Sequence, residues 1–144
     1  MRLGVDVGSV RVGVAISDPD GVLATPLVTL ARDCAGQADV SELATLVAAH
    51  AAVEVVVGLP VGLSGRDGAA AALARTYAAA VAALIAPVEV RFVDERLSTV
   101  SAERMLRGRG VRGKAARQVV DQVAAVVILQ AALDADRAGR RSSE

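Results

Sequence analysis

The sequence predicts a single α/β domain in which a mixed five-stranded sheet carries helices on both faces. Two observations predict this fold. The chain begins with three Val- and Ile-rich segments separated by turn residues, and it then alternates apolar strand-like runs with alanine-rich helical segments. A chain of 144 residues can bury about 68 to 70% of its unfolded surface, so it needs no disulfide or structural metal to hold a core.

The N-terminal part of the chain predicts an antiparallel meander. Segments 2–6 and 11–17 are joined by a turn short enough for a hairpin, and a third strand at 25–30 follows the turn sequence DPDG. Gly13 lies inside the second strand, where a residue without Cβ allows another part of the chain to approach closely. We therefore expect something to pack against this strand at Gly13.

From about residue 40 the apolar period changes to that of helices. Ser41 is expected to cap a helix that ends near His50, and helices are also expected at 69–85, 98–107 and 115–136. The runs 53–57 and 88–93 are typical of buried strands, which complete the sheet. The expected organisation is one domain over 1–136 and a flexible tail over 137–144.

Composition excludes several classes of protein. The single cysteine, Cys34, excludes an intramolecular disulfide and any zinc site built on cysteines. The N-terminus lacks the apolar run of a signal peptide, and the longest uncharged stretches, 76–88 and 122–133, are shorter than the roughly 20 residues that span a bilayer. We expect a soluble cytoplasmic protein with no membrane partner.

Two acids lie at awkward positions in apolar segments. Asp6 alternates with the apolar residues of the first strand, so it points to the opposite face; an Asx turn to the backbone of Gly8 or Ser9 is an equally good explanation for it alone. Asp121 shares a helix face with Ala125 and Ile128, which predicts that it packs toward the sheet. It lies beyond the first helical turn, so the helix dipole does not explain it well.

A third acid follows the last strand, where loops build sites in α/β proteins. Asp94 and Glu95 are adjacent there, and spacing alone does not choose between them. If three acids converge, their oxygens suit one or two hard cations, Mg²⁺ or Mn²⁺. The only histidine, His50, is expected to cap a helix, which leaves no Ser-His-Asp or Cys-His set for nucleophilic catalysis.

A basic segment follows the third acid. From Arg96 to Arg117 there are seven basic residues and one acid, Glu103, although the whole chain has 16 basic and 16 acidic residues. This segment is a candidate phosphate-binding surface, and a solvated helix face with a loop is the alternative.

The chain resembles the YqgF/RuvX family, which has a ribonuclease H-like fold and is similar to Holliday-junction resolvases. The resemblance rests on DVGSVRVGVAISD from Asp6, VVGLP from Val56, DERLST from Asp94 and DQVAAVVILQ from Asp121. It implies Asp6, Glu95 and Asp121 as catalytic acids that bind the metal, with two ions expected. The residues it implies for phosphate contact are Arg11, Arg96, Lys114 and Arg117.

The family implies a metal-dependent endonuclease that processes the 5′ end of pre-16S rRNA. The alternative substrate is branched DNA, cut by a homodimer as a Holliday junction resolvase, whereas RNA processing also suits a monomer. Two other classes remain open, a non-catalytic nucleic-acid-binding module and an actin-like nucleotide-binding protein. The second would need two such domains around its nucleotide.

Overall fold

The computed structural model describes residues 1–33, 35–60, 68–94 and 114–142, with the side chains of 114–120 and 140–142 excepted. Three strands open the chain: β1 (Arg2–Val7), β2 (Arg11–Ser17) and β3 (Ala24–Ala31). They are followed by α1 (Ala38–Ala49), β4 (Glu54–Leu59), α2 (Gly68–Ile85), β5 (Glu89–Asp94) and α4 (Lys114–Ser142). The helix expected at 98–107 lies outside the described residues.

The five strands form one sheet in the order β3-β2-β1-β4-β5. β1 pairs antiparallel with β2, and β2 with β3, whereas β4 runs parallel to both β1 and β5. This confirms the mixed sheet predicted from the sequence. Because β1, β4 and β5 run in the same direction, their carboxyl ends lie at the same edge of the sheet, which we call the carboxyl edge.

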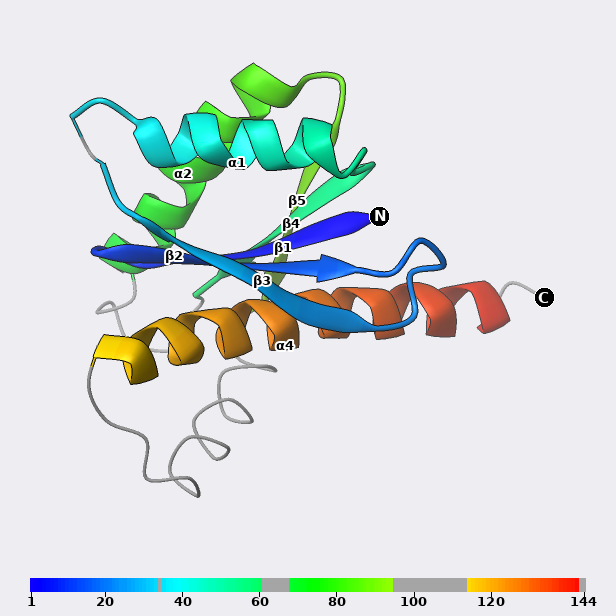
Figure 1. The fold of residues 1–144 in the computed structure, drawn as a ribbon. Helices are drawn as coiled ribbons and strands as arrows, with labels where there is room; N and C mark the ends of the chain where they lie inside the picture. Colours follow the sequence, from blue (N-terminus) through cyan, green and yellow to red (C-terminus); the bar gives the residue numbers. More distant parts are fainter. Residues whose placement is uncertain (34, 61–67, 95–113, 143–144) are drawn as a thin grey trace.

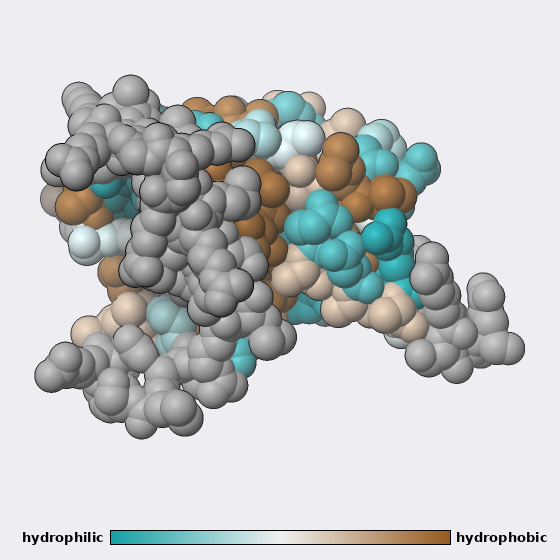
Figure 2. Space-filling model, turned by 90° about the horizontal axis from the view of Figure 1, so that it is seen from below, coloured by the Kyte–Doolittle hydropathy of each residue, from teal (hydrophilic) through white to brown (hydrophobic). Residues whose placement is uncertain are grey.

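Helices cover both faces of the sheet, as predicted (Figure 1). α1 and α2 pack on one face, where Val5, Val57 and Val81 belong to a large apolar cluster. α4 crosses the other face, where Ala125, Ile128 and Leu129 pack on Ala15 and Val56. Seen from the α4 side, hydrophilic side chains gather over the C-terminal half of α4 (Figure 2).

The start of α1 differs from the prediction. Ser41 is not the N-cap, because the helix begins at Ala38 after Gln37, which has a left-handed backbone with φ of 56°. The carboxylate of Asp33 accepts hydrogen bonds from the N–H groups of Gly36 (3.0 Å) and Ala38 (3.2 Å). Asp33 lies outside the helix, yet its carboxylate satisfies the backbone N–H of the first helical residue, Ala38. The sequence pattern around Ser41 does not indicate this contact. His50 is the C-cap, as predicted.

α4 continues past the expected end near Asp136 and is helical as far as Ser142. Asp136 is held by Arg91 of β5 through two hydrogen bonds of 3.0 and 3.1 Å. Arg137 also pairs with Asp134, one turn earlier, at 2.9 Å. These contacts and the high helix propensity of Ala and Arg favour continuation of the helix where the sequence predicted a tail.

Among the described residues, α2 is the one helix long and apolar enough to cross a membrane by length and composition alone. One face of this helix, including Ala74, Tyr77 and Val81, is buried in the apolar cluster that α2 forms with α1 and the sheet. A core helix passes the same test, so this feature is weak evidence for a membrane span.

Candidate functional site

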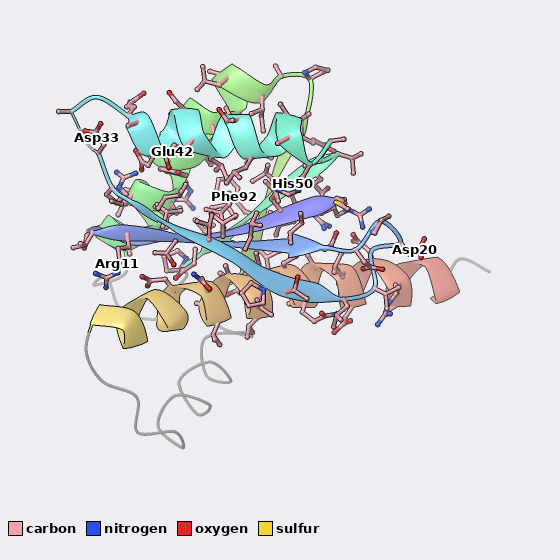
Figure 3. All side chains as sticks on the ribbon, in the orientation of Figure 1. Arg11, Asp20, Asp33, Glu42, His50 and Phe92 are labelled. Atoms are coloured by element: carbon pink, nitrogen blue, oxygen red, sulfur yellow. The ribbon has the colours of Figure 1, made fainter. Side chains whose placement is uncertain are left out.

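The carboxyl edge of the sheet brings together chain segments that are far apart in sequence. β1 ends there, β2 starts there, and α4 begins beside them. Figure 3 shows Arg11 at this edge, close to the first turns of α4, whereas His50 and Asp20 lie toward the opposite end of the sheet. The histidine is therefore remote from Arg11 and from the start of α4, where Asp121 lies.

Asp6 points toward α4, as the alternation along β1 predicts. Leu3 and Val5 belong to the cluster beneath α1 and α2. Gly4 lies on the other face, because a Cβ there would come within 2.5 Å of the Leu129 Cβ in α4. Asp6, two residues further on, shares the face of Gly4. An Asx turn between the Asp6 carboxylate and the N–H of Gly8 is not formed, since this N–H donates to the carbonyl of Arg11 at 2.9 Å.

Gly13 allows α4 to approach the sheet beside Asp6. In the ladder between β1 and β2, Asp6 is directly opposite Gly13. A Cβ at Gly13 would collide with the backbone carbonyl of Asp121, so the backbone of α4 lies directly over this position. The structure therefore brings Asp6 and Asp121 to neighbouring positions on one face of the sheet. The close approach expected at Gly13 is confirmed.

Two side-chain contacts fix the beginning of α4 at this place. The Arg11 Nε donates to Asp121 Oδ2 at 2.7 Å, and the two side chains are 26% and 19% exposed. The Gln122 Nε2 donates to Thr29 Oγ1 at 3.0 Å. Sequence reasoning missed Gln122 and Thr29. The ladder explains their meeting, because Thr29 is opposite Gly13 on β3 and so continues the row formed with Asp6.

The remaining predicted site residues are only partly visible. Glu95 and Arg96 lie outside the described residues, and Asp94, just before them, is the last residue of β5. Of Lys114 and Arg117 only the backbone is described, at the start of α4. The structure therefore places two of the three acids together, and the position of Glu95 stays a prediction.

The donor set at this edge fits a hard cation. Asp6 and Asp121 supply carboxylate oxygens, which Mg²⁺ and Mn²⁺ prefer, on one face of the sheet. Within the described residues there is no cluster of three or more His, Cys, Asp or Glu side chains that could hold a metal ion. A complete site there needs a further oxygen donor, and Glu95 is the candidate that the sequence supplies.

Other charged groups have structural partners. Asp39, only 2% exposed, pairs with Arg32 at 3.2 Å, and the Arg32 guanidinium lies 5.1 Å from the centre of the Tyr77 ring. Burial, with a contribution from Asp39, raises the pKa of the Tyr77 hydroxyl. At the amino end of the strands, the hydrogen bond to Asp136 raises the pKa of Arg91. The Arg32 pair lies on the face covered by α1 and α2, and the Arg91 pair lies at the amino end of the strands, so neither takes part in the grouping of Asp6 and Asp121.

The fold defines the class of protein. A five-stranded mixed sheet of this order, with acids at the carboxyl edge and a long helix across one face, is a ribonuclease H-like domain. The chain superposes on the RuvC of Thermus thermophilus with a TM-score of 0.56 at 15% identity, covering 95% of this chain and 96% of that one. A second RuvC structure, "T. thermophilus RuvC in complex with Holliday junction substrate", gives a TM-score of 0.55 at 16% identity and covers 94% of this chain and 95% of that one. At this identity the likeness shows the fold.

Sequence comparison gives the family. A family model described as "RuvX: Holliday junction resolvase" matches residues 1–135. A relative from Frankia casuarinae is 61% identical over 95% of this chain and 68% of its own length, and one from Mycobacterium sp. (strain KMS) is 60% identical over 95% and 81%. Both are named "Putative pre-16S rRNA nuclease". This chain belongs to the RuvX family, as its motifs indicated.

Proposed function

We propose that this protein is a divalent-metal-dependent endonuclease that hydrolyses phosphodiester bonds at the 5′ end of pre-16S rRNA. Family membership supports the nuclease class, and the names of its relatives support the RNA substrate. The observation that carries the mechanism is the juxtaposition of Asp6 and Asp121 across Gly13. The proposed site of action is the cytoplasm.

In this proposal Asp6, Glu95 and Asp121 hold two Mg²⁺ or Mn²⁺ ions through carboxylate oxygens. Two such ions would activate a water molecule for attack and stabilise the leaving oxygen of the phosphodiester. The protein's own contribution is to hold the carboxylates of Asp6 and Asp121 in position. β1 and α4 fix two carboxylates on one rigid face, so that little reorganisation is needed when substrate binds.

Basic residues beside the acids would position the nucleic-acid backbone. Arg11 is at the edge itself, and Arg96, Lys114 and Arg117 are neighbours in sequence of Glu95 and of the start of α4. Contacts of this kind release counterions from the nucleic acid, so binding should weaken steeply with salt. A flat salt dependence would contradict a phosphate-binding role for these residues.

The test is cleavage of a pre-16S rRNA fragment and a four-way DNA junction, side by side, with Mg²⁺ and with Mn²⁺. Asp6→Asn is expected to remove cleavage and keep the wild-type melting temperature, since the substitution keeps shape and removes charge. Asp20→Asn is the matched control, because Asp20 is exposed and lies away from the carboxyl edge (Figure 3). Wild-type cleavage by Asp6→Asn, or no cleavage by the wild type with either metal, would refute the proposal.

Branched DNA is the second candidate substrate. The family description names a Holliday junction resolvase, and one solved RuvC structure contains a junction substrate. Symmetric cutting of a junction needs two active sites and therefore a dimer, whereas RNA processing does not. Preferential junction cleavage by a dimeric form would favour this candidate. Nucleic-acid binding without cleavage would instead indicate a non-catalytic module.

A further inference from the structure

Arg11 donates a hydrogen bond to Oδ2 of Asp121, one of the carboxylate oxygens that the proposed metal site would use. Its Nε lies 2.7 Å from Oδ2 of Asp121, within the range of a charge-assisted hydrogen bond. Both side chains are more than half buried, so the pair is less screened by solvent than a fully exposed one. In this arrangement the positive charge beside Asp121 comes from the protein itself.

The backbone leaves these two groups little freedom to separate. Arg11 is the first residue of β2 and shares its α4-facing side with Gly13, over which the backbone of Asp121 is packed. Gln122, the next residue of α4, is tied to Thr29 of β3. A change of partner at Asp121 must therefore come from movement of the long Arg11 side chain, since the carboxylate is carried by a fixed helix.

We propose that Arg11 is a counter-ion that neutralises Asp121 in the metal-free protein and gives up this carboxylate when a divalent cation binds. Two consequences follow. Arg11 competes with the cation and so lowers the affinity of the empty protein for metal. Once displaced, its guanidinium is at the carboxyl edge and available to a phosphate oxygen, so metal binding and nucleic-acid binding become coupled.

This inference rests on the proposed function, because it needs Asp121 to be a metal ligand. It differs from a plain phosphate-contact role for Arg11. A residue that only contacts phosphate would leave metal affinity unchanged in the absence of nucleic acid. A residue that holds Asp121 ready for the cation would, when removed, weaken metal binding. Competition alone predicts tighter binding after removal of the arginine.

The first measurement is Mn²⁺ binding to the full chain by isothermal titration calorimetry, without nucleic acid. Arg11→Gln is expected to tighten Mn²⁺ binding about fivefold, the upper range for loss of one partly exposed ion pair. Arg11→Lys keeps the charge and should stay closer to the wild type. Arg137→Gln is the matched control, because Arg137 also pairs with a carboxylate of α4, Asp134, at 2.9 Å but far along the helix.

The second measurement follows the guanidinium directly. In a ¹H–¹⁵N spectrum of arginine Nε–H groups, the resonance that Arg11→Lys removes identifies Arg11. Titration with Mg²⁺ is expected to shift this resonance toward that of a solvated arginine and to leave the Arg137 resonance in place. A readout of this kind does not depend on activity.

The outcomes separate the two proposals. If Asp121→Asn removes Mn²⁺ binding but Arg11→Gln leaves it unchanged or weaker, the metal site stands and the competing role of Arg11 is wrong. The same holds if the Arg11 resonance does not move at saturating Mg²⁺. If Asp121→Asn binds Mn²⁺ as tightly as the wild type does, Asp121 is not a ligand, and both the proposed function at this site and the inference about Arg11 fail.

Discussion

Gly13→Ala tests whether the contact between α4 and the sheet builds the site. A Cβ at residue 13 would lie closer than 3.0 Å to the backbone carbonyl of Asp121, which real Cβ atoms essentially never show. The obstructing atoms are backbone, so they cannot turn aside as the end of a flexible side chain could. Strand and helix must separate locally, and overpacking of this kind costs about 1–3 kcal/mol.

The expected result has two parts. For a chain of this size 1 kcal/mol corresponds to about 2–4 °C, so we expect the melting temperature of Gly13→Ala to fall by roughly 2–12 °C, measured by circular dichroism. The separation also moves Asp121 away from Asp6, so Mn²⁺ affinity, measured by calorimetry, should fall by about tenfold or more, as it does when supports of metal ligands are disturbed.

Other glycines of the chain supply the controls. A Cβ at Gly139, in α4, would meet nothing within 4 Å, so Gly139→Ala should stabilise the protein by about 0.5–1 kcal/mol through helix propensity. At Gly58 a Cβ would meet the flexible end of Ile128, so Gly58→Ala should cost less than Gly13→Ala. A Gly13→Ala protein with wild-type melting temperature and Mn²⁺ affinity would refute the reasoning.

Two further predictions concern stability. Arg91 bridges Asp136 and Glu54 at 3.0–3.1 Å, so Arg91→Gln should cost roughly 1 kcal/mol in urea unfolding at low salt and less in 1 M NaCl, because about a third of the side chain is exposed; a loss independent of salt would contradict an electrostatic origin. Backbone N–H groups of Leu23 and Val22 hold the pKa of Asp18 below its ordinary value of 3.8. A lowered pKa stabilises the fold above the unfolded value, and this stability is lost as the pH falls through the folded pKa. The deficit of Asp18→Asn in urea unfolding should therefore be present at about pH 5 and shrink below about pH 3.8, and a deficit constant with pH would count against this cause.

The sheet was predictable because its signals are local. Alternation along β1 and β2, the turn between them and the apolar runs of β4 and β5 determine which residues face each side, and the ladder confirms that Asp6 faces α4. The face of Asp121 was equally readable, since Ala125 and Ile128 are both fully buried against the sheet. Gly13 was the sequence signal for a close approach to β2, which the structure shows to be made by α4.

Other features depend on contacts between distant residues, so no local pattern predicts them. The helix capped from Asp33 and the extension of α4 past Asp136 both depend on partners outside the segment concerned. The partner of Arg11 is 110 positions away in the chain. The resemblance assigned Arg11 to phosphate contact, and only the fold shows that Asp121, a candidate metal ligand, already pairs with it.

The ion pairs of this domain divide between stability and function according to where they lie. At the amino end of the strands, Arg91 joins β5 to β4 through Glu54 and to α4 through Asp136, so loss of this arginine loosens three elements at once. At the carboxyl edge, α4 is already fixed by backbone packing over Gly13 and by the bond from Gln122 to Thr29. The pair between Arg11 and Asp121 can therefore open without releasing the helix. Substitution of Arg91 should change unfolding more than Mn²⁺ affinity, and substitution of Arg11 should do the reverse.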